Sequence, residues 1–308
     1  LKNNKNSLAG FGSAKGSNEE AYLFQKLIRT GFKTHNVDHC TRLCHASSVA
    51  ALLQSVGSAA VTAPFTSVED AECIILIGAR PEQNHPVAAS YIKQAAKRGA
   101  KLIIIDPRKQ SLSRYSTHHL QFNPGQDLAL LNAIIYIIIK EHLYDENYIN
   151  NHTEGFDILK KEIESLDFNS LSNLCGVNSE LIKNVARIYA KAKSSIIFWG
   201  MGISQHVHGT QNAFSLINLS LITGHVGKPG TGLHPLRGQN NVQGASDAGL
   251  IPMSFPDYKS VNEQDYKFEM QKLWDTPLEY EEGKTVVEII DAIYNNEIKG
   301  LYVQGENP

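Results

Sequence analysis

The stretch Ile74-Ile75-Leu76-Ile77, followed at once by Gly78, decides the fold class of this chain. Similar apolar runs that end in polar or glycine-bearing loops lie at 102–105, 195–198 and 300–303. Continuous rather than alternating apolar character is typical of parallel strands that are covered on both faces. Helical patterns lie between these runs, so the sequence predicts an α/β fold with mostly parallel sheets.

The helical patterns are long enough to cover such sheets. The apolar run at 128–139 is too short to span a membrane and predicts a buried helix. Residues 251–283 carry prolines, acids and aromatics without strong periodicity, which predicts an excursion loop. We expect helices near 19–30, 45–56, 86–98, 126–143, 179–193, 210–222 and 284–296.

Composition excludes several classes of protein. With 308 residues the chain has room for about two domains, and its formal net charge of −2 argues against nucleic acid or an anionic membrane as partner. Four scattered cysteines are too few for a disulfide framework, so we expect a reducing compartment. The chain begins at Leu1 without methionine and stops just after an expected strand, which suggests a fragment of a longer polypeptide.

The most informative motif is Cys40-Thr-Arg-Leu-Cys44-His45. Its spacing differs from that of covalent haem attachment, and it offers too few ligands for a tetrahedral zinc site. At a helix start the dipole lowers the pKa of a thiol, and a thiolate binds a soft metal. The adjacent imidazole can take a proton near neutral pH. The plainer alternative is a buried structural cysteine followed by an ordinary helix-start histidine.

Arg237 lies in the second informative stretch, at 235–244. A guanidinium holds a carboxylate through two parallel hydrogen bonds, and the surrounding glycines and amides suit a polyfunctional heterocycle. A solvated loop is the alternative, which we disfavour because amide side chains are concentrated around one arginine. Cys44, His45 and Arg237 together suit a small carboxylate that loses a proton and two electrons beside a metal. Formate is the simplest such substrate.

Two acidic residues follow expected strands. Asp106 is placed where a carboxylate can accept a hydrogen bond from a ribose hydroxyl or from the edge of a purine. An aspartate before proline also caps helices, which is the alternative. Asp127 begins the long apolar helix, where free backbone N–H groups favour a phosphate, although plain turn chemistry is the alternative. No strict G-x-G-x-x-G follows a strand, so nicotinamide binding in a Rossmann turn is poorly supported.

At these residues the chain resembles the catalytic alpha subunit of molybdenum- or tungsten-dependent formate dehydrogenases. They belong to the large family that binds the metal through two molybdopterin guanine dinucleotides. Cysteine followed by histidine is the discriminating feature, because related nitrate reductases typically lack the histidine. The matching pieces are Gly16-Ser-Asn-Glu-Glu20, Asn36-Val-Asp38, Arg42-Leu-Cys44-His45 with Ser48-Val49, Gly78 to Pro86, Asp106-Pro-Arg108, the Asp127 helix start, Trp199-Gly-Met-Gly202, and Arg237 to Gly244.

The resemblance implies a role for each of these residues. Cys44 is expected to be the protein ligand to Mo or W, His45 the proton acceptor beside it, and Arg237 the formate anchor. The terminal residues 305–308 are expected near a guanine dinucleotide. Positions expected to line the cofactor are Gly78, Asn84, Asp106, Asp127, Gly200, Gly202, Gln205, Gly238, Gln239 and Gln243.

The resemblance also implies an architecture of two interlocked Rossmann-like αβα domains. One would span 40–236 and carry the metal-ligand loop, and the other would combine 1–39 with 237–308. The N-terminal cysteine cluster of the family, which holds a [4Fe-4S] centre, is missing, as are its neighbouring lysine and the C-terminal domain. We therefore expect the [4Fe-4S] centre only upstream of this fragment, and the isolated fragment to be inactive.

The expected partners of the whole protein are formate and electron-transfer subunits or domains, with no nucleic acid and no direct membrane insertion. Its expected compartment is the cytoplasm, or the periplasm if a leader precedes the fragment. Two alternatives stay open. The scaffold can serve another substrate, as in a nitrate reductase, or the piece can be a nucleotide-binding or assembly module without chemistry.

Overall fold

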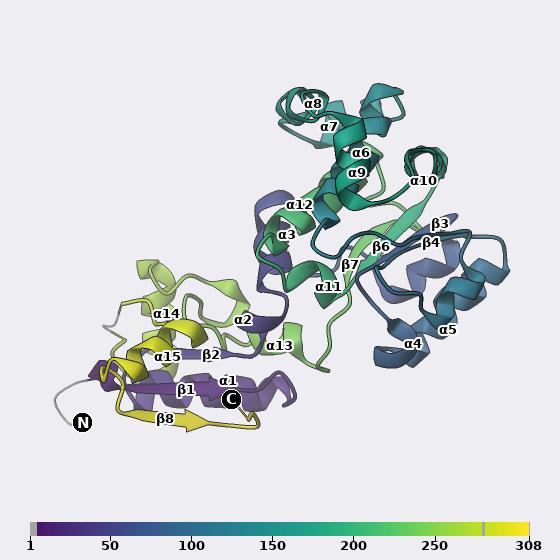
Figure 1. The fold of residues 1–308 in the computed structure, drawn as a ribbon. Coiled ribbons are helices and arrows are strands. Elements are labelled where there is room, and N and C mark those ends of the chain that lie inside the picture. Colours follow the sequence, from purple (N-terminus) through teal and green to yellow (C-terminus); the bar gives the residue numbers. More distant parts are fainter. Residues whose placement is uncertain (1–4, 279–280, 308) are drawn as a thin grey trace. The chain divides into compact units, whose positions relative to one another are not determined.

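The computed structural model describes residues 5–278 and 281–307 (Figure 1). The chain divides into two compact units: unit 1 comprises Leu1–Cys44 with Arg237–Pro308, and unit 2 comprises His45–Leu236. Each unit holds one sheet with only parallel strand pairs, so the predicted α/β class is confirmed. The sequence had assigned residues 40–44 to the larger domain, whereas the structure groups them with unit 1.

The sheet of unit 2 has the strand order β5-β4-β3-β6-β7. Taken in chain order this is 3-2-1-4-5, the doubly wound arrangement whose direction of winding reverses between the first and fourth strands. The central strand β3 is fully buried, as expected for an apolar run covered on both faces. The strands are β3 (Cys73–Ile77), β4 (Lys101–Ile105), β5 (His118–Leu120), β6 (Ser195–Trp199) and β7 (Gly232–Pro235).

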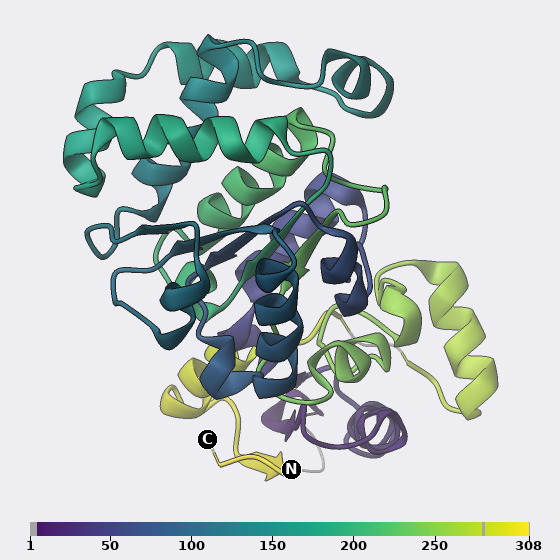
Figure 2. The same cartoon turned by 90° about the vertical axis from the view of Figure 1, so that its right-hand side faces the viewer.

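Helices cover both faces of this sheet (Figure 2). Alternate residues of β3 divide between two apolar clusters: Ile75 packs with α3, α6, α10 and α12, while Ile74 packs with α5 and η3. The helices are α3 (Ala46–Val56), η3 (Phe65–Asp70), α4 (Pro81–Asn84), α5 (Pro86–Lys97), η4 (Ser111–Tyr115), α6 (Asp127–Lys140), α7 (Glu146–His152), α8 (Phe156–Glu164), α9 (Phe168–Cys175), α10 (Ser179–Lys191), α11 (Met201–Ser204) and α12 (Gly209–Ile222).

The long apolar helix predicted at 126–143 is α6, and most of its residues are buried in unit 2. It covers the sheet together with α10 and α12, which explains why its sequence is apolar nearly all round. Within the described part of the chain, no helix combines the length and apolarity needed to cross a membrane.

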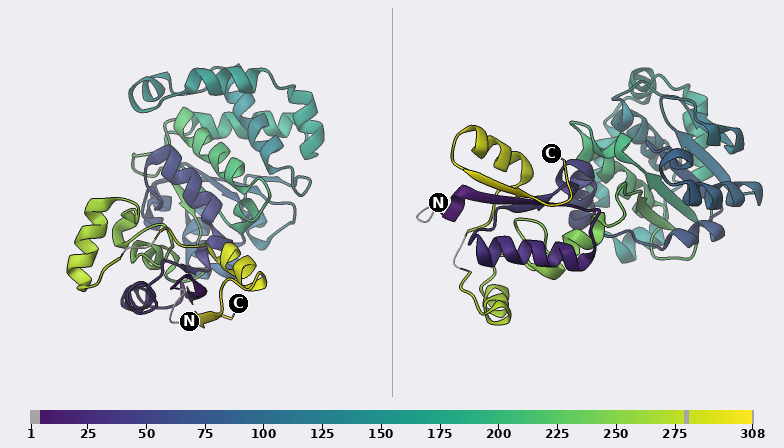
Figure 3. Two further views of the ribbon diagram at one scale, coloured as in Figure 1. Left: turned by 90° about the vertical axis from the view of Figure 1, so that its left-hand side faces the viewer. Right: turned by 90° about the horizontal axis from the view of Figure 1, so that it is seen from below.

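Unit 1 contains a three-stranded sheet in the order β2-β1-β8. Figure 3 shows α15 and α1 on opposite sides of strand β1, and the apolar clusters agree, because Phe11 packs with α15 while Val37 packs with α1 and α13. The elements are η1 (Lys5–Ser7), β1 (Leu8–Gly12), α1 (Asn18–Lys26), η2 (Leu27–Gly31), β2 (Val37–His39), α2 (Thr41–Cys44), α13 (Val242–Asp247), η5 (Pro256–Tyr258), α14 (Gln264–Trp274), α15 (Val286–Tyr294) and β8 (Gly300–Val303).

Part of the predicted excursion loop at 251–283 is helical. It contains α14, whose inner side joins a small apolar cluster of Phe255, Val261, Trp274 and Leu278. The sequence did not reveal this helix because only Trp274 among its residues is buried. The segment has no apolar stripe of its own. It is therefore ordered by the burial of a few aromatic residues from separate positions.

A fully buried arginine organises the start of this segment. Arg29 donates to the carbonyl oxygens of Gly249 at 3.2 Å, Ile251 at 2.7 Å and Ser254 at 2.8 Å. Its guanidinium also bonds to Nδ1 of His35. Burial lowers the pKa of His35 to about 2, with the Arg29 charge contributing, so the imidazole stays neutral.

We expect the substitution Arg29→Met to lower the free energy of unfolding by about 3 kcal/mol, because it leaves buried carbonyl groups without donors. Urea denaturation of the purified protein measures the change. The matched control is Arg98→Met on the exposed end of α5, where the expected loss is below about 0.5 kcal/mol. Equal losses in the two variants would show that Arg29 does not organise the segment.

Candidate functional site

Cys44 and Arg237 both belong to unit 1, where the charge of Arg237 acts on the Cys44 thiol. Burial raises the pKa of the Cys44 thiol, while the charge of Arg237 and a hydrogen bond from the backbone of Gly238 act in the opposite direction. Burial likewise lowers the pKa of Arg237, and Cys44 is one of the groups that oppose this effect. The site therefore pairs a thiol with a partly desolvated cation, which strengthens their mutual attraction when the sulfur is ionised.

The helix that carries Cys44 is anchored by a buried carboxylate. Asp38 accepts from Nε of Arg42 at 3.0 Å and from the backbone N–H of Val286 at 3.0 Å. Its side chain is fully buried, so the ion pair is shielded from water more than a surface pair would be. A guanidinium nitrogen of Arg42 also contacts the sulfur of Met253 at 3.6 Å. Arg42 thus links α2 to the strand β2, and to the segment that follows α13.

The side chain of His45 has all its described hydrogen-bond partners in unit 2. Nε2 lies 3.1 Å from the carbonyl oxygen of Leu236, and Nδ1 lies 2.8 Å from Oγ of Ser204 and 3.3 Å from Oγ of Ser48. A carbonyl only accepts, so Nε2 carries the proton and Nδ1 accepts from a serine hydroxyl. The imidazole is fully buried.

Three of the predicted cofactor-lining glycines bring two loops of unit 2 into contact. Gly78 follows β3 with φ of 57°, and its carbonyl accepts from the N–H of Gly202 at 3.1 Å. A Cβ at Gly78 would lie 2.9 Å from the carbonyl carbon of Gly202, and one at Gly200 would lie 2.6 Å from the oxygen of Gly78. The loops meet between β3 and β6, where a doubly wound sheet reverses direction and binds ligands.

The other predicted positions of unit 2 lie at the same edge of the sheet, because each follows the carboxyl end of a strand. Asp106 accepts from the backbone N–H of Arg108 at 2.8 Å and from Nε2 of Gln110 at 3.4 Å, so its turn-capping role is real. Burial raises the pKa of Asp127 at the start of α6. Asn84 and Gln205 are exposed at the ends of α4 and α11.

Buried polar atoms at this edge suit a polar ligand. Among the described residues, Nε of Arg80, Oε1 of Gln110 and Oδ1 of Asn212 are buried without a hydrogen-bond partner. Such atoms are rare in folded proteins, and each would be satisfied by a ligand that both donates and accepts. A dinucleotide-like cofactor has this character, so the residues present fit the group that the sequence analysis expects.

Unit 1 offers a second, smaller recess at the carboxyl ends of β1 and β8. Its volume is about 230 Å³, and near it the hydroxyl of Ser13 donates to Glu306 at 2.9 Å. The segment 305–308 was predicted to lie near a guanine dinucleotide; Gly305 lines this recess, whereas Pro308 lies outside the described residues. The lining residues are Ser13, Lys15, Gly16, Glu20, Ala21, Leu250, Gln304 and Gly305.

The amide-rich stretch after Arg237 is only partly explained by packing. Asn240 donates to the carbonyl of Lys15 at 3.4 Å, and Asn241 donates to that of Gly16 at 3.0 Å. These two amides therefore hold a neighbouring loop and do not by themselves indicate a ligand, which corrects the inference drawn from their concentration. Oε1 of Gln239, in contrast, is buried without a hydrogen-bond partner in the described structure. Gly238 is exposed and Gln243 is half-buried on α13.

Protein side chains alone do not complete a metal site. Across residues 5–278 and 281–307, the structure contains no cluster of three or more histidine, cysteine or acidic side chains able to hold a metal. A metal ion bound at Cys44 would therefore take its remaining ligands from a bound group. This requirement agrees with the metal–pterin cofactor that the resemblance implies.

Two residues that the sequence did not single out act electrostatically on Arg237. Asp247 and Tyr258 both oppose the effect of burial on the pKa of Arg237. No spacing signal could have revealed them, because Tyr258 lies in the segment without periodicity.

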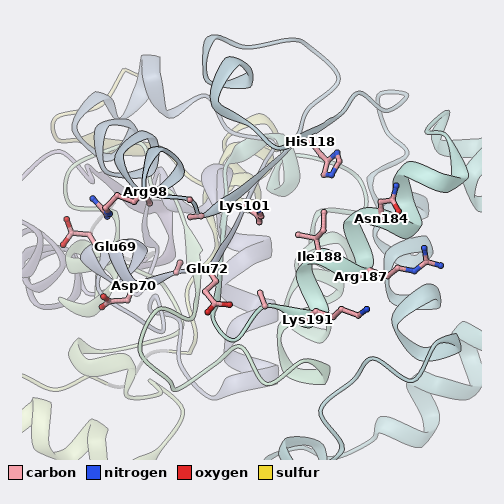
Figure 4. Close-up of a pocket in the computed structure, with 15 residues that line it drawn as sticks. Glu69, Asp70, Glu72, Arg98, Lys101, His118, Asn184, Arg187, Ile188 and Lys191 are labelled. Atoms are coloured by element: carbon pink, nitrogen blue, oxygen red, sulfur yellow. The ribbon is translucent and has the colours of Figure 1, made fainter.

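A larger cavity of unit 2 lies elsewhere. It has a volume of about 830 Å³ and opens at the amino ends of β4 and β5, opposite the edge that carries Gly78 and Gly200. Figure 4 shows acidic Glu69 and Glu72 together with basic Arg98, Lys101 and Lys191 around this opening. The charges have mixed signs, and none of the predicted site residues lines the cavity. It is not the candidate site.

Known proteins resemble the chain along its full length. The family model described as "Molybdopterin oxidoreductase" matches residues 1–308. The chain is 44% identical over 308 residues to "F420-dependent formate dehydrogenase subunit alpha" of Methanocaldococcus jannaschii, covering 100% of this chain and 45% of the relative. It is 38% identical over 299 residues to "Formate dehydrogenase H" of Escherichia coli, covering 96% of this chain and 42% of the relative.

A solved structure shares the fold. "Acetylene Hydratase from Pelobacter acetylenicus" aligns with a TM-score of 0.65 and 23% sequence identity, covering 74% of this chain and 31% of the other. At this identity the likeness concerns the fold alone. The chain spans less than half the length of the two curated relatives, at 45% and 42%.

We expect Gly78→Ala to lower the free energy of unfolding by about 3 kcal/mol, since it adds a backbone overlap to the strain of a left-handed residue. The matched control is Gly57→Ala, which has φ of 73° and no atom within 4 Å of the added Cβ. The control should lose only about 1 kcal/mol. Urea denaturation of both variants measures the difference, and equal losses would refute the close approach of the two loops.

Proposed function

The chain belongs to the molybdopterin oxidoreductase family, and on this premise we propose that it forms the central part of a formate dehydrogenase alpha subunit. In the whole enzyme it would help to oxidise formate to CO2 at a Mo or W centre held by two molybdopterin guanine dinucleotides. The names of the relatives at 44% and 38% identity support this assignment.

The observation that carries the proposal is that Cys44 and Arg237 lie in unit 1, with the Arg237 charge acting on the Cys44 thiol. A sulfur ligand and a carboxylate-binding guanidinium are the two groups that a metal-dependent oxidation of formate needs side by side. The cation is buried enough to be desolvated, which favours a charged, planar substrate over water. Neither a purely structural cysteine nor a solvated arginine would require this arrangement.

The residues of this chain would each contribute a distinct step. When bound, the metal and its pterins would supply the two-electron chemistry. Cys44 would hold the metal through its sulfur, and Arg237 would bind the formate carboxylate through two parallel hydrogen bonds. Oxidation of formate to CO2 releases one proton and two electrons, and His45 would be the group that accepts the proton.

In each unit, the residues expected to contact the cofactor lie at the edge of the sheet where the parallel strands end. In unit 2 the glycine loops and the unsatisfied polar atoms of Arg80, Gln110 and Asn212 would contact it. In unit 1 the recess beside Gly305 and the buried oxygen of Gln239 would do the same. The [4Fe-4S] centre and the electron-transfer partners would be supplied by parts outside this chain.

We expect Cys44→Ala in the full-length protein to lower the rate of formate oxidation by at least about 10³-fold, as removal of an essential group does. The matched control is Cys175→Ala, since Cys175 is a free, buried cysteine of unit 2. The measurements are steady-state assays with formate, together with the Mo and W content of both variants. A Cys44→Ala enzyme with wild-type rate and metal content would rule out the ligand assignment.

We expect Arg237→Lys to raise the KM for formate by about 10- to 100-fold, because a point charge cannot reproduce two parallel hydrogen bonds. Arg98→Lys on exposed α5 is the control and should leave both kinetic constants unchanged. Unchanged KM and kcat in Arg237→Lys would remove the arginine from the substrate site.

The full-length protein also distinguishes the alternatives. Reduction of nitrate without oxidation of formate would indicate a different oxyanion substrate on the same scaffold. A preparation without Mo, W or pterin, and without either activity, would instead favour a nucleotide-binding or assembly module.

A further inference from the structure

Resting on the proposed function, we propose that His39 is a positioning residue for the metal ligand. Its imidazole would bridge α2, the short helix that ends in Cys44, to α13, the helix into which the Arg237 segment leads. The bridge would keep the sulfur of Cys44 in one place before and after a metal binds. Every residue in this inference belongs to unit 1.

Helix α2 is too short to hold its own position. It comprises Thr41–Cys44, which is a single turn, and isolated helices shorter than about 12 residues are marginal in water. Its first and last residues are buried, whereas Leu43 is 56% exposed, so little apolar surface fixes the turn. The position of Cys44 therefore depends on contacts between α2 and neighbouring elements.

Strand β2 supplies such contacts from both of its faces, because successive side chains of a strand point to opposite sides of the sheet. Asp38 lies on the side of α15, where it accepts from the backbone N–H of Val286 at 3.0 Å and from Nε of Arg42 at 3.0 Å. His39 shares the opposite side with Val37, which packs with α1 and α13. Two residues adjacent in sequence thus reach α2 from two directions.

The hydrogen bonds of His39 run in one direction, from α2 to α13. Nδ1 lies 3.1 Å from Oγ1 of Thr41, and Nε2 lies 3.0 Å from Oγ of Ser246. The Ser246 hydroxyl donates its single hydrogen to the carbonyl of Val242 at 3.3 Å, so it accepts from Nε2 of His39. Nδ1 then accepts from the hydroxyl of Thr41. Each ring nitrogen is therefore used once, in one tautomer.

The surroundings of the bridge maintain this tautomer. His39, Thr41 and Ser246 are all buried. Burial lowers the pKa of His39 to about 3, and the charge of Arg42 acts in the same direction, so the imidazole stays neutral. A buried polar atom that loses its partner is not compensated by water. The three side chains are therefore held to one another.

Helix α13 is a firm support for the bridge. Its buried Ala245 lies in an apolar cluster with residues of α1. A Cβ at Gly244 would overlap the side-chain oxygen of Asn18, so α13 packs closely against the start of α1. The N–H of Asn241, just before α13, donates to the carbonyl of Ala14 at 2.9 Å. A bond to α13 therefore ties α2 to an element that is itself held.

This arrangement suits the placement of a metal ligand, which has to be held within about 0.5 Å of its productive position. Cys44 lies in the same turn as Thr41, so any movement of the turn displaces the sulfur. The imidazole is a rigid ring with one acceptor and one donor, and it therefore transmits the position of Ser246 to Thr41. Without the bridge, the pair of Asp38 and Arg42 would have to hold the turn.

The test is the reactivity of Cys44 in the full-length protein prepared without Mo or W. Thr41→Val keeps the shape of the side chain and removes its hydroxyl. Alkylation of Cys44 by iodoacetamide, followed by mass spectrometry, should then become about five- to tenfold faster. Thr41→Ser restores the hydroxyl and should return the rate to within about twofold of the wild type. No acceleration in Thr41→Val, or an equal acceleration in Thr41→Ser, would overturn the proposal.

Two controls separate a local effect on α2 from general loosening. Cys175, a buried cysteine of unit 2, is read in the same experiment and should keep its wild-type rate in every variant. Thr30→Val removes a hydroxyl of unit 1 that donates to the carbonyl of Lys26 at 2.8 Å, and it should leave the Cys44 rate unchanged. An equal rise at Cys175, or in Thr30→Val, would mean general stability alone and would overturn the proposal.

A double-mutant cycle tests whether Thr41 and Ser246 act through one histidine. The imidazole stays in place, since removal of a buried ring would create a cavity. Ser246→Ala should accelerate alkylation of Cys44 as Thr41→Val does, and the double variant should exceed the faster single variant by less than about twofold. Factors that multiply would show that the two hydroxyls act independently, and the bridge would be rejected.

The assembled enzyme gives a second readout. In Thr41→Val, kcat for formate should fall about tenfold while KM changes less than about threefold, because the sulfur is displaced and Arg237 is untouched. An unchanged kcat would overturn the positioning role even with faster alkylation. If the wild type does not oxidise formate, the proposed function fails by itself, and the alkylation rates still decide whether His39 bridges α2 to α13.

Discussion

The candidate site depends on pairs of residues that are far apart in the sequence and interact within one unit. The chain crosses from unit 1 to unit 2 between Cys44 and His45, and it returns to unit 1 between Leu236 and Arg237. In unit 1 the Arg237 charge and the Gly238 backbone act on Cys44, and in unit 2 Nε2 of His45 bonds to the carbonyl of Leu236. In each unit, residues that are far apart in the sequence therefore interact beside a crossing point of the chain.

Buried charge is used in this protein to organise loops. Arg29 is fully buried, and in the described structure its charged group bonds to backbone carbonyls, Gln25 and His35 rather than to a carboxylate. Asp38 similarly anchors α2 through Arg42 and the backbone of α15. Removal of one partner from such a group leaves the others buried and unsatisfied, which is strongly unfavourable. The loops around Cys44 and Arg237 are held by these interactions, where little apolar surface is available.

The two sheets explain why the polar residues collect where they do. Parallel strands end at one edge, so the loops after β3, β4 and β6 are neighbours although long stretches of sequence separate them. Glycines at 78, 200 and 202 allow two of these loops to touch, and unsatisfied polar atoms remain at the same edge. At this edge the backbones of the two loops are therefore closely packed, while polar side-chain atoms remain available to a ligand.

Much of this could be predicted from the sequence, because local patterns report local structure. Apolar runs such as 74–77 and 102–105 specify buried parallel strands, and the helix expected at 179–193 is α10 at Ser179–Lys191. Cys44 and Arg237 were identifiable because cysteine before histidine and an arginine among amides are unusual locally. Tertiary structure alone decided that His45 bonds within unit 2 and that Asn240 and Asn241 hold a neighbouring loop. These contacts join positions separated by 159 to 225 residues, and they arise from burial and chain return, which leave no periodic pattern in the sequence.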